Sequence, residues 1–395
     1  MSDEFYRIRR LPPYVIAEVN NMRHAARQAG KDIIDLGMGN PDHPPPQHVI
    51  DKLCEVAQKP NAHGYSQSKG IPGLRKAQAN YYGRRFNVDL DPEREVVVTM
   101  GSKEGLSSMA TAIIAPGDVV LAPSPSYPIH TFGFIIAGAT IRSVPTTPDE
   151  RYWKALENAM AYTVPRPTVL VVNYPSNPTA ETVDLAFYER LVAWARENKV
   201  WVLSDLAYSE LYYDGKPTRS ILEVPGAKDV AVEFTSMSKT YSMAGWRMGF
   251  AVGNPQLISA LTRVKSYLDY GAFTPIQAAA CAALNGPQDI VEENRQRYQR
   301  RRDVMVESFS RAGWEIPSPP ASMFAWAPIP KAFHNAGSLE FSKQLLEHAG
   351  VAVAAGVGYG EEGEGYVRIA MVENEQRLRQ AARNIKRFLA SSGST

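Results

Sequence analysis

Several features that would direct this chain into a membrane or out of the cell are missing. No run of about 18 apolar residues occurs in its 395 residues, so a membrane-spanning helix is not expected. The two cysteines, Cys54 and Cys281, show no C-x-x-C spacing, which fits a reducing compartment and favours a role in filling the core. The opening residues MSDEFYRIRRLPPY contain no apolar signal region, so we expect a cytoplasmic protein.

Charge and histidine spacing give no indication of nucleic acid or metal binding. The net charge of +2 at pH 7 provides no long-range attraction to nucleic acid or to an anionic membrane. The basic stretch at 295–303 would spread its charges over several faces of a helix, so we interpret it as a solvated or interdomain helix. The seven histidines show no metal-ligand spacing, and no metal site is expected.

One short glycine pattern also carries little weight. GYGEEG at 358–363 matches the dinucleotide pattern G-x-G-x-x-G. No strand-to-helix unit follows it, and its two glutamates would repel a pyrophosphate. We therefore interpret this segment as a flexible loop near Arg368.

The middle of the chain alternates short apolar runs with helical patterns. The runs expected to form strands are 95–100, 118–123, 168–173, 200–205 and 230–235, and the apolar run MGFAVG at 248–253 is expected to form another after the segment of Lys239. Helical spacing lies between them, most clearly at 102–114 and 184–199. Continuous apolar strands separated by helices are typical of an α/β fold, with a mostly parallel sheet covered on both faces.

The length of the chain favours two domains of unequal size. We predict an N-terminal arm and part of a small domain at 1–43, a large domain at 44–286, and the rest of a small α+β domain at 287–395.

Polar residues follow four of the predicted strands. Ligands of open α/β sheets bind beyond the carboxyl ends of the strands, so these residues are the candidates for chemistry. They are GSKEG at 101–105, YPSNPT at 174–179, Asp205 with Tyr208, and SMSK at 236–239.

Lys239 is the candidate nucleophile, because a desolvated lysine next to positive charge loses proton affinity and can form a Schiff base with a carbonyl. Pyridoxal phosphate carries an aldehyde, a pyridine nitrogen and a phosphate, and it fits the surrounding groups. Asp205 would pair with the ring nitrogen, and Asn177 and Tyr208 would donate hydrogen bonds to the phenolic oxygen. Tyr127 would stack on the ring.

The phosphate requires donors and a cation. Gly101, Ser102 and Lys103 open a predicted helix, where backbone amides favour an anion. The hydroxyls of Ser236 and Ser238 and the guanidinium of Arg247 would complete this cradle. Structural roles remain possible for Asp205 and Ser102 as helix caps and for Arg247 as an ion-pair partner.

The ordered motifs S-x-S-K, G-W-R eight residues after the lysine, N-P-T, D-x-x-Y and a late arginine resemble the fold-type I, class I/II pyridoxal-phosphate aminotransferases. The resemblance covers nearly the whole chain. DLGMGNPD, HGYSQSKGIPGLR and SKTYSMAGWRMGF are most similar to bacterial glutamate:pyruvate (alanine) aminotransferases. The fold that this implies has a mostly parallel seven-stranded sheet in an α/β/α sandwich, plus a smaller α+β domain.

The resemblance also implies roles for residues that spacing does not reveal. Arg368 would bind the substrate α-carboxylate, with Gly39 and Asn40 at the substrate. Tyr65 would reach the cofactor phosphate across a homodimer interface. Tyr14 could close over the substrate from the N-terminal arm, although packing is its simpler interpretation.

The implied reaction is a ping-pong transamination between an L-amino acid and a 2-oxo acid, with Lys239 as base and acid. Aspartate-type relatives recognise a distal carboxylate with a partner-subunit arginine, yet residues 266–274 contain no arginine. Alanine and pyruvate with glutamate and 2-oxoglutarate are therefore the expected substrates, although nothing in the sequence explains how the distal carboxylate of glutamate is held. Aspartate, aromatic amino acids or LL-diaminopimelate as donors, or a carbon–sulfur lyase on the same fold, are the alternatives.

Overall fold

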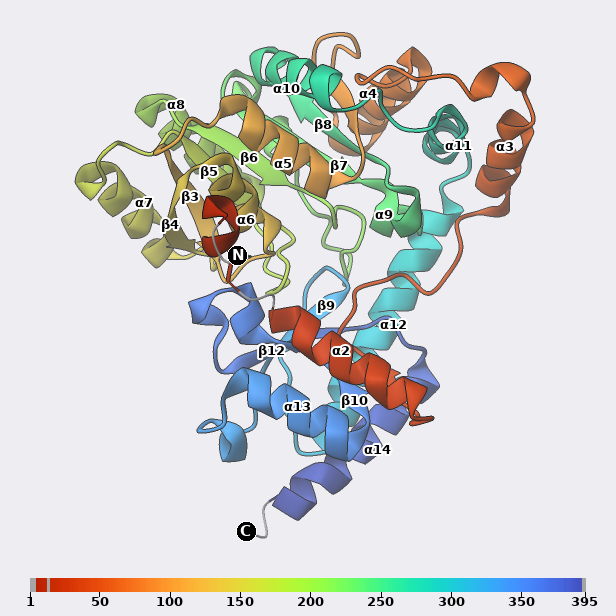
Figure 1. Cartoon of the computed structure of the whole chain (residues 1–395), viewed down its shortest axis with the longest axis vertical. Helices are drawn as coiled ribbons and strands as arrows, with labels where there is room; N and C mark the ends of the chain where they lie inside the picture. Colours follow the sequence, from red (N-terminus) through yellow and green to blue (C-terminus); the bar gives the residue numbers. More distant parts are fainter. Residues whose placement is uncertain (1–4, 13–14, 393–395) are drawn as a thin grey trace.

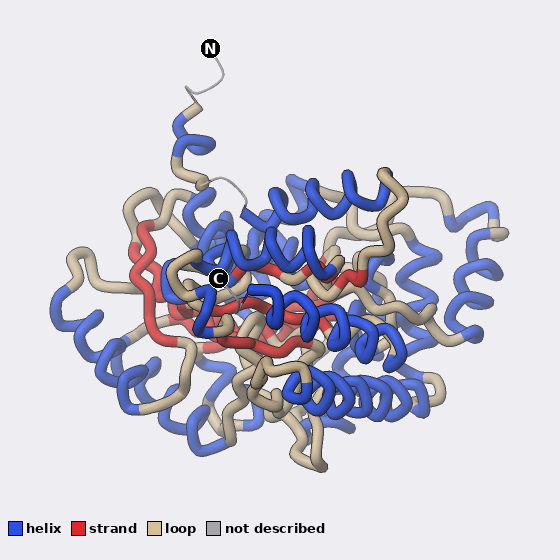
Figure 2. Tube along the Cα trace, turned by 90° about the horizontal axis from the view of Figure 1, so that it is seen from below, coloured by secondary structure: helices blue, strands red, loops and turns tan. Residues whose placement is uncertain are grey.

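A seven-stranded sheet forms the centre of the larger part of the molecule in this computed structural model, which describes residues 5–12 and 15–392. Figure 1 shows this sheet in the upper half, and Figure 2 shows the strands in the interior with helices outside them. Across the sheet the strands are β2 (Val96–Thr99), β8 (Gly249–Gly253), β7 (Ala231–Ser236), β6 (Trp201–Asp205), β5 (Val169–Asn173), β3 (Val119–Ser124) and β4 (Thr140–Pro145).

The direction of the strands brings their carboxyl ends to one edge. The pairs from β7 through β6, β5 and β3 to β4 are parallel, and β8 is antiparallel to both of its neighbours. Thr99 and Ser236 both pair with Gly249, at the start of β8. A Cβ at Gly249 would lie 2.8 Å from the carbonyl carbon of Gly101, so only glycine lets these segments approach so closely.

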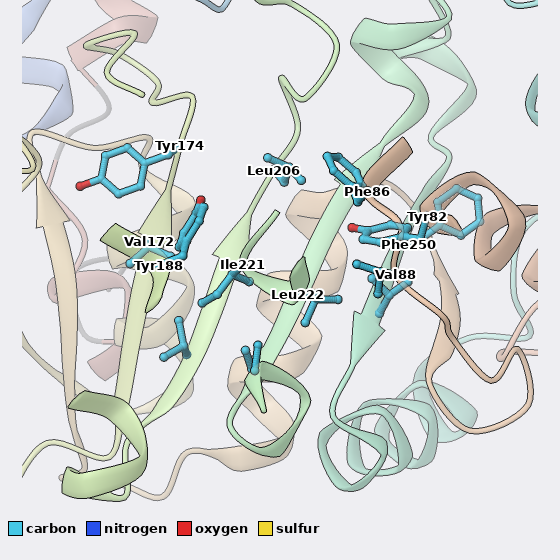
Figure 3. Packing of buried hydrophobic residues seen from close by; sticks show 14 of the residues in the cluster. Tyr82, Phe86, Val88, Val172, Tyr174, Tyr188, Leu206, Ile221, Leu222 and Phe250 are labelled. Atoms are coloured by element: carbon cyan, nitrogen blue, oxygen red, sulfur yellow. The ribbon is translucent and has the colours of Figure 1, made fainter. Parts of the chain in front are cut away.

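Alternate strand residues face two separate helical layers, as the period of two predicts. Val171 packs in the layer of α5 (Ser102–Ile113), α6 (Ile129–Ala137) and α10 (Pro255–Leu268). Val172 packs in the other layer, part of which Figure 3 shows. That layer contains α4 (Pro72–Phe86), α7 (Glu150–Tyr162), α8 (Leu185–Asn198) and α11 (Thr274–Asn285), with α3 (Gln47–Ala57) against α11.

The smaller part of the molecule has its own core and two small sheets. One sheet is antiparallel and contains β11 (Ala354–Ala355), β12 (Tyr366–Ala370) and β9 (Phe324–Pro328); the other pairs β1 (Ile34–Asp35) with β10 (Val351–Ala352). The helices around them are α2 (Val15–Gln28), α12 (Asp289–Arg311), α13 (Gly337–Ala349) and α14 (Glu375–Ser392). The four-residue α1 (Tyr6–Arg9) precedes them.

The predicted fold class is confirmed, and each predicted strand coincides with a strand of the large sheet. The edge strand β4 was not predicted, because its residues are partly exposed and do not read as an apolar run. We propose the domain boundaries at 43/44 and 286/287 because β1 pairs with β10 of the C-terminal part. Within the described residues, no helix has both the length and the apolar character needed to cross a bilayer.

Three smaller predictions can be compared with the structure. Cys54 is exposed, so the prediction that it fills the core was wrong, and Cys281 is half-buried. In α12, Arg301 forms a two-bond ion pair with Asp42, and Arg302 does so with Asp214. These pairs join α12 to segments of both parts of the chain, which agrees with an interdomain helix.

Glu233 is a fully buried carboxyl in the middle of β7. Its oxygens accept hydrogen bonds from the Tyr82 and Ser204 hydroxyls at 2.9 and 3.1 Å, the Ser220 hydroxyl at 2.5 Å and the Ile221 amide at 3.3 Å. These donors favour the ionised form, but burial outweighs them and raises the pKa of Glu233 from its ordinary 4.5 to about 7.

The raised pKa of Glu233 predicts a pH-dependent contribution to stability. The folded protein binds this proton more tightly than the unfolded chain does, so the contribution is complete below pH 4.5 and is lost as pH rises through about 7. Relative to Glu233→Gln, the wild-type free energy of unfolding should fall by roughly 3 kcal/mol between pH 4.5 and 8. Urea titrations of both cofactor-free proteins across this range measure it, and parallel pH profiles would contradict it.

Candidate active site

A cavity of about 290 Å³ lies at the carboxyl ends of β3, β5, β6 and β7, where the two parts of the molecule meet. The small domain contributes to its wall from β9 and β12, and the segment 37–39 crosses it. The predicted site residues that line it are Gly39, Ser102, Lys103, Tyr127, Asn177, Asp205, Tyr208, Ser236, Ser238, Lys239, Arg247 and Arg368.

Lys239 lies on the short helix α9 (Met237–Thr240), directly after β7. The Ser236 hydroxyl caps this helix by accepting a hydrogen bond from the amide of Ser238 at 3.2 Å. The Nζ of Lys239 donates to the carbonyl oxygen of Gly39 at 2.5 Å. Burial, assisted by the positive charges of Arg368 and Arg247, lowers the pKa of Lys239 to about 8. Far more of this amine than of an ordinary lysine is therefore neutral, and nucleophilic, near physiological pH.

Asp205 ends β6 at the closed side of the cavity and is buried. One carboxyl oxygen lies 2.9 Å from Nε2 of His130 in α6, whose ring is fully buried. The other oxygen accepts the amide of Ala207 at 3.2 Å. These contacts fix the carboxylate where it can hold one positive group at the bottom of the cavity.

A chain of hydrogen bonds joins the amide of Asn177 and the phenol of Tyr208 at this edge to Arg368 of the small domain. The Nδ2 of Asn177 donates to the Tyr208 hydroxyl at 3.3 Å. Arg368, in β12, donates to Oδ1 of Asn177 at 3.0 Å and to the carbonyl oxygen of Gly37 at 2.7 Å. Its guanidinium carbon lies 3.9 Å from the centre of the Phe324 ring. Burial is the main reason why the pKa of Tyr208 lies well above its ordinary value, so this hydroxyl remains a donor.

The opposite end of the cavity forms an anion cradle at the start of α5. Gly101 precedes this helix with a φ of +85°, and a Cβ there would lie 2.4 Å from Nη2 of Arg247. Glycine thus allows the guanidinium to lie beside the first amides of the helix. Arg247 is held by the carbonyl oxygens of Ala244 and Met100, at 2.8 and 3.3 Å.

Three of the predicted site residues that the structure describes do not line the cavity. Gly101 lies just behind its wall, and Asn40 is exposed, with its amide bonded to the carbonyl of Met38. The Tyr65 side chain is 89% exposed, and its ring centre lies 4.7 Å from that of Tyr270. Tyr14 lies outside the described residues.

The sequence reasoning missed His130, which lies behind the cavity wall against Asp205, and several residues of the wall itself. His130 follows Tyr127 by three residues, a spacing that puts both on one side of a helical turn and could have drawn attention to it. Asn173, Phe324 and Tyr359 line the cavity, and no local motif marks them.

The segment 358–363 is not the loop that was predicted. Gly356–Tyr359 and Glu361–Gly363 form two 3₁₀ turns that pack on each other. The buried Tyr359 ring lies 5.0 Å from the guanidinium carbon of Arg368, so this segment forms part of the wall.

These groups fit pyridoxal phosphate on independent grounds. The amine of Lys239, with its lowered pKa, matches the aldehyde. The carboxylate of Asp205 matches the ring nitrogen, and the cradle at Gly101 and Arg247 matches the phosphate. The fold and the cavity define a pyridoxal-phosphate enzyme of fold type I. Residues 31–385 match the family described as aminotransferase class I and II, and the chain belongs to this family, whose members depend on pyridoxal phosphate.

Three relatives show how far the likeness extends. The chain is 64% identical to AatC of Rhizobium meliloti (strain 1021), provisionally named an aminotransferase, over all of this chain and 97% of that protein. It is 51% identical to the glutamate-pyruvate aminotransferase AlaC of Escherichia coli (strain K12), over 98% and 94%. It is 43% identical to the LL-diaminopimelate aminotransferase of Moorella thermoacetica, over 98% of each chain.

A solved structure shows the same fold over nearly the whole chain. Substrate-bound BacF from Bacillus subtilis superposes with a TM-score of 0.91 at 34% identity, covering 98% of both chains. The resemblance inferred from the motifs is therefore confirmed, and the protein is an aminotransferase.

Proposed function

We propose that this aminotransferase transfers the α-amino group between L-alanine or L-glutamate and the corresponding 2-oxo acids, pyruvate and 2-oxoglutarate. The identity of 51% to AlaC supports these substrates, as does the absence of arginine at 266–274. The observation that carries the assignment to α-amino acids and 2-oxo acids as a class is the state of Arg368. This guanidinium is buried, and among the described residues no acidic side chain forms an ion pair with it.

A buried guanidinium without a counter-ion is costly unless an anion binds it. Its Nε is buried and has no hydrogen-bond partner in the described part of the chain, while Nη1 and Nη2 bond only neutral oxygens. An α-carboxylate is planar and accepts two parallel hydrogen bonds, which is the geometry that a guanidinium offers. We assign Arg368 to this group, which every L-amino acid and 2-oxo acid carries.

The other residues then have separate tasks. When bound, pyridoxal phosphate supplies a protonated ring that accepts electrons from the substrate α-carbon. Asp205 would keep the proton on the ring nitrogen, and Asn177 and Tyr208 would donate to the phenolic oxygen. Lys239 would hold the aldehyde and would serve as the base that takes the proton of the substrate α-carbon and as the acid that returns it.

The phosphate binds at the start of α5. The amides of Ser102 and Lys103, the hydroxyls of Ser102, Ser236 and Ser238, and the fork of Arg247 surround this end of the cavity. Tyr127 would cover the cofactor ring. The Nζ of Lys103 lies 5.7 Å from the centre of the Tyr127 ring. Gly39 and Asn40 would border the substrate.

Replacing Arg368 should weaken the binding of every carboxylate substrate. Arg368→Gln is expected to raise KM for alanine and for pyruvate by a similar factor, about 10²-fold, since both lose the same ion pair. Arg368→Lys keeps the charge but loses the fork, so a smaller rise is expected. Ethylamine, which is alanine without its carboxylate, serves as control, because its slow conversion should not change. An unaltered KM for alanine would remove Arg368 from this role.

The substrate assignment is tested by half-reactions. Stopped-flow mixing of the holoenzyme with each of twenty amino acids and with LL-diaminopimelate should give the fastest spectral conversion with alanine or glutamate. The absence of amplitude with both would refute this specificity, and a dominant LL-diaminopimelate signal would favour the activity named for the Moorella relative. Pyruvate and ammonia released from cystathionine without an oxo acid acceptor would indicate a lyase.

We also propose a cytoplasmic homodimer in which Tyr65 of the partner subunit reaches the cofactor phosphate. Large aromatic side chains are exposed close to Tyr65, which is a common sign of an interface. Tyr270, 63% exposed, lies against the Tyr65 ring, and Tyr267 and Phe273 on the same segment are exposed to 83 and 44%.

The proposed dimer predicts that replacing Tyr65 lowers the affinity for the cofactor, although Tyr65 does not line the cavity of its own subunit. Tyr65→Phe should weaken pyridoxal-phosphate binding by about tenfold, because one hydrogen bond to a charged phosphate is lost. Tyr162→Phe, another exposed tyrosine, is the matched control. Light scattering should give twice the chain mass of 43.6 kDa, and a monomer that binds the cofactor normally would contradict the proposal.

A further inference from the structure

A buried lysine that the reaction does not use lies below the anion cradle. Lys265, in the last turn of α10, has 1% of its side chain exposed. Its Nζ lies 3.2 Å from both carboxyl oxygens of Glu104 and 2.8 Å from one oxygen of Asp269. A buried ammonium is costly, so its retention here requires these two partners.

One of the partners belongs to the start of α5. Glu104 follows Ser102 and Lys103, and one of its oxygens accepts the amide of Met100 at 2.8 Å. The other accepts the Ser108 hydroxyl at 2.7 Å. Glu104 thus ties together the two sides of the turn at Gly101, where the phosphate is proposed to bind.

The second partner belongs to the turn that carries the exposed aromatic residues. Asp269 caps the end of α10 and accepts the amide of Gly271 at 2.6 Å. Its carbonyl oxygen accepts the hydroxyl of Ser68. The turn therefore holds Tyr270 and, through Ser68, the segment that contains Tyr65.

Without the ammonium of Lys265, the partly buried carboxylates of Glu104 and Asp269 would face each other with no positive charge between them. Glu104 and Asp269 have 22 and 14% of their side chains exposed, so water screens their repulsion only in part. The carboxylate on α5 and the one on the turn would then separate. Separation would move the amide of Met100, and with it the first amides of α5.

We propose that Lys265 is a positioning residue that fixes the phosphate cradle of α5 relative to the turn at 269–271. It does not line the cavity, and it acts through Glu104 on the amides that face the phosphate. The inference rests on the proposed phosphate site. It adds a link from that site to the surface on which Tyr65 lies.

The test separates binding of the phosphate from binding of the aldehyde. Pyridoxal phosphate and pyridoxal share the ring and the aldehyde that reacts at Lys239, and only the former has a phosphate. Dissociation constants of both are measured by absorbance on cofactor-free wild type, Lys265→Met, Glu104→Gln and Lys52→Met. Lys52 is an exposed lysine paired with Glu55, and it serves as the matched control.

Lys265→Met should raise the dissociation constant of pyridoxal phosphate by about tenfold or more and change that of pyridoxal less than about twofold. Glu104→Gln keeps the ion pair of Lys265 with Asp269 and should show the same selective loss to a smaller degree, which provides a result if Lys265→Met does not fold. Equal weakening of both compounds, or weakening of neither, in the folded variants would overturn the proposal. Failure of the wild type to hold pyridoxal phosphate on Lys239 after borohydride reduction would instead overturn the proposed function.

Discussion

Replacing Lys239 by alanine is expected to reduce the rate of transamination by at least about 10⁴-fold while leaving the fold intact. The variant loses the amine that lies against the Gly39 carbonyl oxygen in the cavity wall, and with it the base for the substrate α-proton. Single-turnover rates with alanine measure the effect. Borohydride treatment of the wild type, followed by peptide mass analysis, should place the cofactor on Lys239.

Two controls separate proton transfer from general damage. Methylamine should restore part of the rate of Lys239→Ala in proportion to its concentration, because a small diffusible amine can carry the same proton. In the cofactor-free wild type, capture of pyridoxal phosphate should accelerate as pH rises through about 8, since only the neutral amine attacks. A variant that retains activity, or a cofactor found on another lysine, would remove Lys239 from the mechanism.

Asp205→Asn is expected to reduce kcat/KM by about 10³-fold. Unit charges about 4 Å apart at an effective dielectric near 20 attract by roughly 4 kcal/mol, which corresponds to about three pKa units on the ring nitrogen. The amide of asparagine preserves the volume but cannot hold that proton. The measurement is steady-state kinetics with alanine and 2-oxoglutarate at saturating cofactor.

A cofactor analogue methylated on the ring nitrogen provides the control for Asp205. Its positive charge does not depend on a carboxylate, so it should activate Asp205→Asn more than it activates the wild type. His130 offers a graded comparison, because it contacts Asp205 at 2.9 Å and does not line the cavity. His130→Asn should lower the rate far less than Asp205→Asn, and equal losses would indicate that the packing around the pair, not the charge, is what matters.

Local patterns in the sequence predicted most of the large domain. Apolar runs buried on both faces marked six strands, and polar residues directly after them marked Asp205, Lys239 and the start of α5. The prediction failed where burial is partial: β4 is an edge strand without an apolar run. It also failed where a residue contributes through packing alone, as Phe324 does against Arg368.

What the sequence determined by itself is the chemistry at the edge of the sheet. Parallel strands end at a common edge, so residues that follow separate strands must meet there, whatever the remainder of the chain does. Three features were decided only by the tertiary structure. They are the pairing of Asp205 with His130, the lack of a carboxylate partner for Arg368 within the described residues, and the burial of Lys265 between Glu104 and Asp269. The contacts of Asp205 with His130, of Lys265 with Glu104 and of Arg368 with Asn177 join residues 75, 161 and 191 positions apart, and each also depends on how far the charge is removed from water. Neither property is encoded in a local pattern of residues.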